Sequence, residues 1–182
     1  QDLKDGAQLV DNRFIIKESE KQLHLIEQQI DYTESEMEAT IQQDEQVWKR
    51  VQLTKSVVGI GLVTAVAFLI HTQNFTAFEN SRQFACYAGV APFEYRSGTS
   101  VRGKPKVSPL ANRRMKALLS NCASAAVQHD PQLKSYYQRK VKEGKAKMTV
   151  LNAVKAKLID RVFATVNRGT AYVPIIQYNR AA

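Results

Sequence analysis

The stretch between Asp11 and Val58 contains neither proline nor glycine, the two residues that most readily interrupt a helix. Within it, large apolar residues recur every seven positions, and charged residues fill most of the positions between them. The repeat consists of Ile16, Leu23, Ile30 and Met37. This pattern predicts a long amphipathic helix that continues with little interruption to Trp48 and Leu53.

The second apolar position of this repeat is imperfect, because Ser19, Thr33 and Thr40 interrupt it. Two interpretations therefore stay open, a coiled coil that joins two copies of the chain and a helix that packs against its own chain. Either way, residues 1–55 are predicted to form a helical stalk.

Helix start and stop signals punctuate the rest of the chain. A capping residue precedes a short helix that ends near Tyr87, two later helices begin with a cap followed by proline, and a final long helix ends at a glycine. The signals are Asn80 or Ser81, Ser108-Pro109, Asp130-Pro131 and Gly169. The sequence thus predicts an all-α fold, with a compact helical domain over residues 56–173 and an irregular tail over residues 174–182.

Charge is divided unevenly along the 182 residues. Residues 94–182 carry 18 Lys and Arg against 4 Asp and Glu, whereas residues 1–93 carry 8 against 13. The second half is therefore strongly basic, which favours a polyanionic partner, most simply nucleic acid.

Two cysteines, Cys86 and Cys122, lie in apolar helical contexts without the paired spacing of a zinc site or a disulfide scaffold. We interpret them as buried thiols of a cytoplasmic protein and predict no metal site in this chain. The longest apolar run, residues 57–70, is broken by two glycines and is too short to span a bilayer.

Those glycines, Gly59 and Gly61, lie between two apolar segments in the order expected of a helix-hairpin-helix. In that arrangement small residues let the backbone approach a phosphate, and the second helix directs its first N–H groups at it. An ordinary tight turn between packed helices gives the same pattern, so both interpretations stay open.

A glycine- and proline-containing loop follows the helix that ends near Tyr87 and holds two serines, Ser97 and Ser100, among four cations. The cations are Arg96, Arg102, Lys104 and Lys106. A serine hydroxyl surrounded by cations is suited to engage an anion such as a phosphate, although a mobile basic surface loop would have the same composition.

The helix predicted to begin at Ser108-Pro109 carries Arg113 and Arg114 in its early turns. Cations at a helix N-terminus are unfavourable with the macrodipole, so a bound anion would explain them. A solvated basic face is the alternative.

Taken in order, these motifs resemble the C-terminal half of the IS110 class of insertion-sequence transposases. The resemblance extends from about Val51 to Val173. It is carried by the segments at 57–65, by Tyr87-Ala88-Gly89-Val90-Ala91-Pro92 with Arg96-Ser97-Gly98, by residues 108–119, and by His129-Asp130-Pro131 with Tyr136-Tyr137.

The resemblance implies a DNA recombinase in which an N-terminal RuvC-like domain holds magnesium through acidic residues and a C-terminal serine becomes covalently joined to DNA. That serine corresponds to Ser97, with Ser100 as the fallback. A structured guide (bridge) RNA and assembly into dimers and tetramers are also implied, in a bacterial, nucleoid-associated setting. No RuvC-like strands or acidic set occur in this sequence, so we expect the stalk and transposase domain alone, through truncation, isolation or decay.

Three functions follow as hypotheses. The chain is a strand-transfer domain with Ser97 as nucleophile, a nucleic-acid-binding and dimerisation module without chemistry, or a structural helical protein. Salt-dependent nucleic-acid binding separates the third from the other two.

Overall fold

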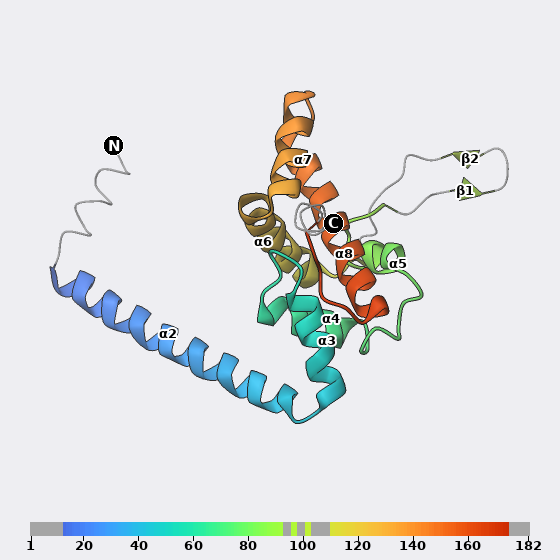
Figure 1. The fold of residues 1–182 in the computed structure, drawn as a ribbon. Helices are drawn as coiled ribbons and strands as arrows, with labels where there is room; N and C mark the ends of the chain where they lie inside the picture. Colours follow the sequence, from blue (N-terminus) through green and yellow to red (C-terminus); the bar gives the residue numbers. More distant parts are fainter. Residues whose placement is uncertain (1–12, 93–95, 98–100, 103–109, 175–182) are drawn as a thin grey trace, which may run out of the picture. The chain divides into compact units, whose positions relative to one another are not determined.

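The computed structural model describes residues 13–92, 96–97, 101–102 and 110–174 and confirms the all-α fold (Figure 1). The chain divides into two compact units, residues 1–44 and 45–182. The elements are α2 (Arg13–Gln42), α3 (Glu45–Lys55), α4 (Leu62–His71), α5 (Ser81–Tyr87), β1 (Arg96–Ser97), β2 (Val101–Arg102), α6 (Arg113–His129), α7 (Pro131–Lys142) and α8 (Lys147–Arg168).

The first unit contains α2, which has no buried residue. The helix that was predicted to continue with little interruption to Leu53 is divided at Gln43 and Asp44 into α2 and α3. At Gln43 and Asp44 the backbone N–H groups bond to carbonyls three residues back, on Thr40 and Ile41, instead of four, so the helix tightens and ends. A new helix, α3, begins immediately after Asp44, a residue type that favours helix starts.

The compact unit therefore begins at Glu45 rather than at residue 56, and it includes α3. The reason is packing, because α3 buries Val51, Leu53 and Thr54. This helix contacts both α4 and α8, which belong to the same unit.

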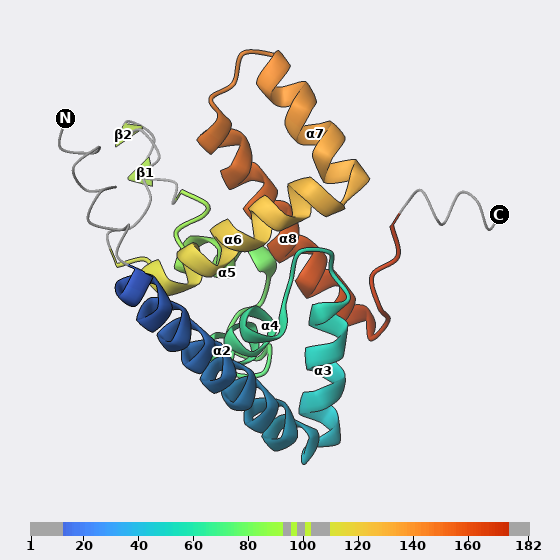
Figure 2. The same cartoon turned by 90° about the vertical axis from the view of Figure 1, so that its left-hand side faces the viewer.

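The longest helix of the second unit, α8, is its central element. It contacts α3, α5, α6 and α7, and Figures 1 and 2 show these helices arranged around it. Its inward face is apolar and fully covered at Val154, Leu158 and Val162, as the helical spacing of these residues predicts.

A cluster of aromatic rings joins α4, α5 and α8 in the core. The rings of Phe68 and Phe84 stack with centroids 5.0 Å apart, and Phe163 lies 5.7 Å from Phe84. Such pairs add to the stability gained from burial alone, so they fix how these three helices pack.

Three predicted helix ends are confirmed. The side chain of Asn80 accepts from the N–H of Gln83, Asp130 accepts from Leu133 ahead of a first-turn proline, and Gly169 ends α8 with φ of 69°.

The predicted start at Ser108-Pro109 is wrong for α6, which begins at Arg113. Asn112 is the cap, and its Oδ1 accepts from the N–H of Met115 at 2.8 Å. Ser108 and Pro109 lie outside the described residues.

Both cysteines are buried and free, as predicted. Burial raises the pKa of the Cys122 thiol, whose Sγ lies 3.3 Å from the Oγ1 of Thr64. Among the helices that the structure describes, none is both long enough and apolar enough to cross a membrane.

Candidate nucleic-acid interface

The segment that carries Ser97 contains a short antiparallel strand pair that the sequence did not predict. Ser97 in β1 pairs with Val101 in β2, and Arg96 pairs with Arg102. The backbone thus places Ser97 next to two arginine positions on one ladder. The structure describes only the backbone of these four residues. It does not describe Gly98, Ser100, Lys104 or Lys106.

The two ends of this segment are tied together by Tyr87, the last residue of α5, and Asn112, the cap of α6. The Asn112 N–H donates to the carbonyl oxygen of Tyr87 at 2.9 Å, and its Nδ2 donates to the Tyr87 hydroxyl at 2.8 Å. These two hydrogen bonds join the end of α5 to the start of α6.

A third residue extends this network into α4. The Nδ1 of His71 lies 2.9 Å from the Tyr87 hydroxyl. His71 is the last residue of α4, in agreement with its interpretation as a helix-end residue. The sequence signal for this network was weak, because Asn112 was recognisable as a capping residue type but nothing connected it to Tyr87.

The first turns of α6, which follow Asn112, carry basic residues and no acidic ones. Arg113 and Arg114 are exposed and Lys116 is half-buried, and the first turn of α6 contains no acidic residue. Within the described part of the chain, none of the three forms an ion pair. The helix dipole disfavours these charges, and no described carboxylate offsets the cost.

A fourth cation, Lys155 on α8, is buried nearby. Its side chain is only 3% exposed, and its Nζ donates to the Oδ1 of Asn152 at 3.1 Å. No carboxylate among the described residues pairs with it. Burial, and secondly the charge of Lys116, lower the pKa of Lys155. The contact between α6 and α8 thus brings a buried lysine into the electrostatic field of Lys116.

We define the basic turn as Arg113, Arg114, Lys116 and Lys155. A buried lysine without a counter-ion is costly, and a second lysine beside it increases the cost. An anion with several oxygens offsets such costs, since it accepts from several N–H donors at once. A phosphate of a nucleic-acid backbone has this chemistry.

The glycine turn has a different environment. Gly59 has φ of 94°, and a Cβ there would lie 2.7 Å from the carbonyl oxygen of Cys122 and 2.8 Å from the Cβ of Ala126. Its close approach is therefore to α6 of the same chain, which favours the tight-turn interpretation for this glycine.

Gly61, by contrast, is exposed at the N-terminus of α4 with nothing within 4 Å of a built Cβ. The turn meets α6 at Cys122, about 14 Å along the helix from Arg113 at 1.5 Å per residue. The structure therefore does not bring the glycines and the basic turn into one site.

Metal ligands are not clustered in this region. Across the residues whose placement is described, no group of three or more His, Cys, Asp or Glu side chains is arranged to hold a metal ion.

Comparison with known proteins gives a consistent result. Residues 51–138 match the family model described as Transposase IS116/IS110/IS902 family. The chain is 32% identical over 117 residues to the insertion element IS110 uncharacterized 43.6 kDa protein of Streptomyces coelicolor, covering 64% of this chain and 29% of that protein.

Two further relatives come from other bacteria. A pilin gene-inverting protein of Moraxella bovis is 23% identical over 175 residues, covering 88% of this chain and 54% of that protein. The insertion element IS900 uncharacterized 42 kDa protein of Mycobacterium paratuberculosis is 26% identical over 127 residues, 69% of this chain and 32% of that protein. The chain thus spans between 29% and 54% of the length of these relatives.

Proposed function

Because this chain carries a transposase domain of the IS116/IS110/IS902 family over residues 51–138, we propose that it engages the DNA backbone through the basic turn and supplies Ser97 as the nucleophile of strand transfer. The observation that carries the proposal is the unpaired charge of the basic turn, which begins directly after the tied ends of the Ser97 segment. The printed name of the Moraxella bovis relative, a pilin gene-inverting protein, agrees with DNA rearrangement as the overall reaction.

The proposed step is in-line attack of the Ser97 hydroxyl oxygen on a backbone phosphorus. A bond forms between that oxygen and phosphorus while the bond from phosphorus to one deoxyribose oxygen breaks. The serine loses its proton and the leaving oxygen gains one. Negative charge builds up on the phosphate oxygens, and nearby cations stabilise it. Arg96 and Arg102, which flank the Ser97 ladder in sequence, and Arg114 are the residues we propose for this role.

Several partners are part of the proposal through the family resemblance. These are a structured guide RNA, magnesium held by an acidic RuvC-like domain, and association of several copies through α2. We further propose that the protein acts at the bacterial nucleoid. The encoding DNA upstream of Gln1 is the direct test for the acidic domain.

The second candidate function is a nucleic-acid-binding and dimerisation module without chemistry. It is favoured by the same basic turn, because unpaired cations can bind a phosphate without any nucleophile. A substitution of the serine separates the two functions.

We expect Ser97→Ala, introduced into the complete product of the gene, to bind its DNA normally and to form no covalent protein–DNA adduct. The reason is that the change removes one oxygen and leaves every cation in place. Adducts are measured as a DNA-dependent shift on a denaturing gel, with Ser100→Ala as the matched control. Adduct formation that persists in Ser97→Ala and disappears in Ser100→Ala would transfer the role to Ser100. Absence of any adduct with the unsubstituted protein would favour the module without chemistry, and persistence in both variants would assign the attack to a residue other than these two serines.

A further inference from the structure

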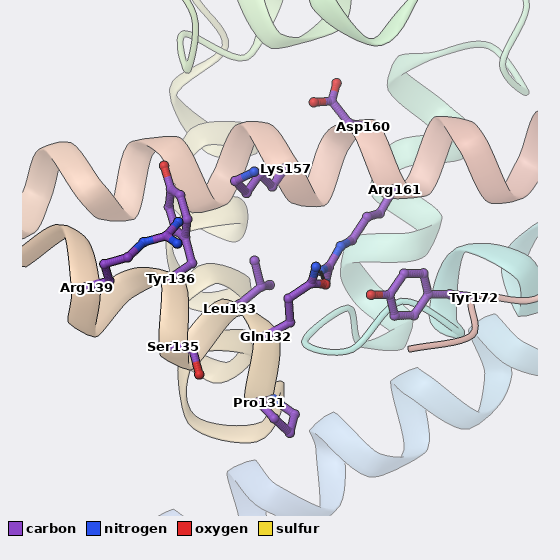
Figure 3. A pocket seen from close by; sticks show the side chains of 10 residues that line it. All are labelled: Pro131, Gln132, Leu133, Ser135, Tyr136, Arg139, Lys157, Asp160, Arg161 and Tyr172. Atoms are coloured by element: carbon purple, nitrogen blue, oxygen red, sulfur yellow. Dashed lines mark hydrogen bonds between the residues drawn. The ribbon is translucent and has the colours of Figure 1, made fainter. Parts of the chain in front are cut away.

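A second basic region lies at the far side of α8, in a groove of about 1050 Å3 between α7, α8 and the segment that follows α8. Figure 3 shows Tyr136 and Arg139 at one end and Tyr172 at the other, with Lys157 between them. Pockets for small ligands typically have volumes of about 300–1,000 Å3, so the volume of this groove is larger than one small ring system needs. None of its residues belongs to the basic turn.

The groove combines aromatic rings with cations. The Nζ of Lys157 lies 4.8 Å from the centroid of the Tyr136 ring, and the guanidinium of Arg139 lies 5.9 Å from the same centroid. At the other end, the guanidinium of Arg161 lies 4.7 Å from the centroid of the Tyr172 ring. Both rings are half-buried, and each keeps part of its surface accessible.

The three cations differ in how far they are neutralised. Arg161 donates to the buried carboxylate of Asp130 at 2.7 Å, so its charge is compensated inside the fold. Lys157 is exposed and has no carboxylate at ion-pair distance among the described residues.

Arg139 is also largely available. Its side chain is 66% exposed, and its only described ion pair is with Glu143 at 3.9 Å. That carboxylate is held more closely by Lys140 at 2.6 Å, and this hydrogen bond is the main reason that the pKa of Glu143 is lowered. The one acid lining the groove, Asp160, is drawn pointing away from α7 in Figure 3. The groove therefore keeps a positive charge at the end that holds Tyr136.

Half-buried tyrosine rings beside exposed cations suit an unpaired nucleic-acid strand. Bases that are not stacked in a duplex stack on aromatic side chains, and the adjoining phosphates pair with cations. A duplex hides the faces of its bases and cannot use such rings.

We propose that the groove between α7 and α8 binds an unpaired stretch of a nucleic-acid strand, whose bases stack on Tyr136 and Tyr172 and whose phosphates contact Arg139 and Lys157. The inference goes beyond strand transfer at Ser97, and it relies on the proposed function only in taking nucleic acid as the ligand. Packing of α7 on α8 accounts for Leu133 and for the Arg161–Asp130 pair, but it does not account for two exposed cations aligned on one ring.

The test measures the affinity of the 182-residue chain for labelled oligothymidylate, oligouridylate and a hairpin duplex of equal length. Tyr136→Leu removes the ring and is expected to weaken binding of the single strands about tenfold while leaving the duplex within about twofold. Tyr136→Phe keeps the ring and is expected to bind as the unsubstituted chain does. Melting curves of all variants establish that they are folded.

A charge-matched comparison isolates the groove from general attraction. Arg139→Gln with Lys157→Gln is expected to reduce the slope of log affinity against log salt for single strands by about 1.4. Lys134→Gln with Lys142→Gln removes the same charge from exposed positions of α7 that do not line the groove, and it is expected to change that slope much less.

Equal losses in the two double variants, or a Tyr136→Leu loss that is as large for the duplex, would overturn the proposal. Unchanged single-strand affinity in Tyr136→Leu would overturn it as well. The DNA and RNA arms identify the strand, since the tyrosine-dependent loss follows whichever oligonucleotide uses the groove. Loss of duplex binding in Arg113→Ala with Arg114→Ala, beside unaffected groove variants, would leave the proposed function standing and reject only the groove.

Discussion

Lys155 is the residue whose burial most needs an explanation. Burial of a lysine without a carboxylate costs stability, and here a second lysine, Lys116, adds repulsion. A residue that serves only the fold would be replaced by an apolar one at lower cost. The position is therefore understandable if the cost is offset when an anion binds.

We expect Lys155→Met to raise stability and to weaken DNA binding. Removing the buried charge is expected to stabilise the chain by about 1 kcal/mol and to raise its melting temperature by about 3 °C at pH 7. Because Lys155 is buried, it is expected to act on the DNA through its charge and not through a phosphate contact, so the salt slope of duplex binding should fall by less than the about 0.9 of one direct contact. Thermal unfolding and fluorescence anisotropy measure the two effects.

The stability gain has a defined pH dependence. Because the pKa of Lys155 is lowered in the folded protein, the charged lysine costs stability at every pH below that lowered pKa. The cost declines as the pH rises through it and is gone above the ordinary value of 10.5. The advantage of Lys155→Met should therefore shrink between neutral pH and pH 10.5, and a constant advantage would contradict our account of its cause.

At the scale of elements, the turn between α3 and α4 contains two glycines that have different surroundings. Gly59 has a left-handed backbone and contacts α6, whereas Gly61 has φ of −88° and open space around it. The sequence pattern treats them alike. Their neighbours make one a packing residue and leave the other accessible.

We expect Gly59→Ala to destabilise the protein by more than about 2 kcal/mol, because a methyl group would meet the backbone of α6 in addition to the strain of positive φ. Gly61→Ala is the matched control and is expected to change stability by less than about 1 kcal/mol. Urea denaturation measures both. Similar effects at the two positions would mean that α6 yields to the added methyl group.

At the scale of the whole molecule, the basic second half of the chain favours a polyanionic partner. Arg113 and Arg114 are exposed and without ion pairs in the described part of the chain, so removing them should not disturb the core. We expect Arg113→Ala with Arg114→Ala to reduce the salt slope of duplex binding by about 1.8 and to leave the melting temperature nearly unchanged. A large fall in melting temperature would instead assign these arginines to the fold.

The N-terminal helix carries the expectation of self-association. Leu23, Ile26 and Ile30 of α2 are each at least half exposed, at 59%, 50% and 51%. If α2 forms a coiled coil between copies, Leu23→Asp with Ile30→Asp should convert an oligomer to a monomer, because a carboxylate at a seam position is costly to bury. Light scattering coupled to gel filtration gives the mass, with Glu27→Asp as a control. A monomer before substitution would exclude the coiled coil at the concentration used.

The sequence predicts those features of the fold that depend on interactions between residues close together in the chain. The helical class, the starts of α5 and α7 and the end of α8 were predictable, because the caps Asn80, Asp130 and Gly169 act within a few residues of the helices that they delimit. The basic character of the second half is likewise set by composition alone.

Other features were decided only when distant segments met. The contact of Asn112 with Tyr87 joins α6 to α5, and the close approach of Gly59 is to α6. The left-handed backbone of three successive residues, Gln73, Asn74 and Phe75, occurs where Arg50 of α3 donates to Asn74. The burial of Lys155 and the groove between α7 and α8 belong to this group. No local pattern encodes them, because burial and charge proximity are properties of the packed helices and not of any one segment.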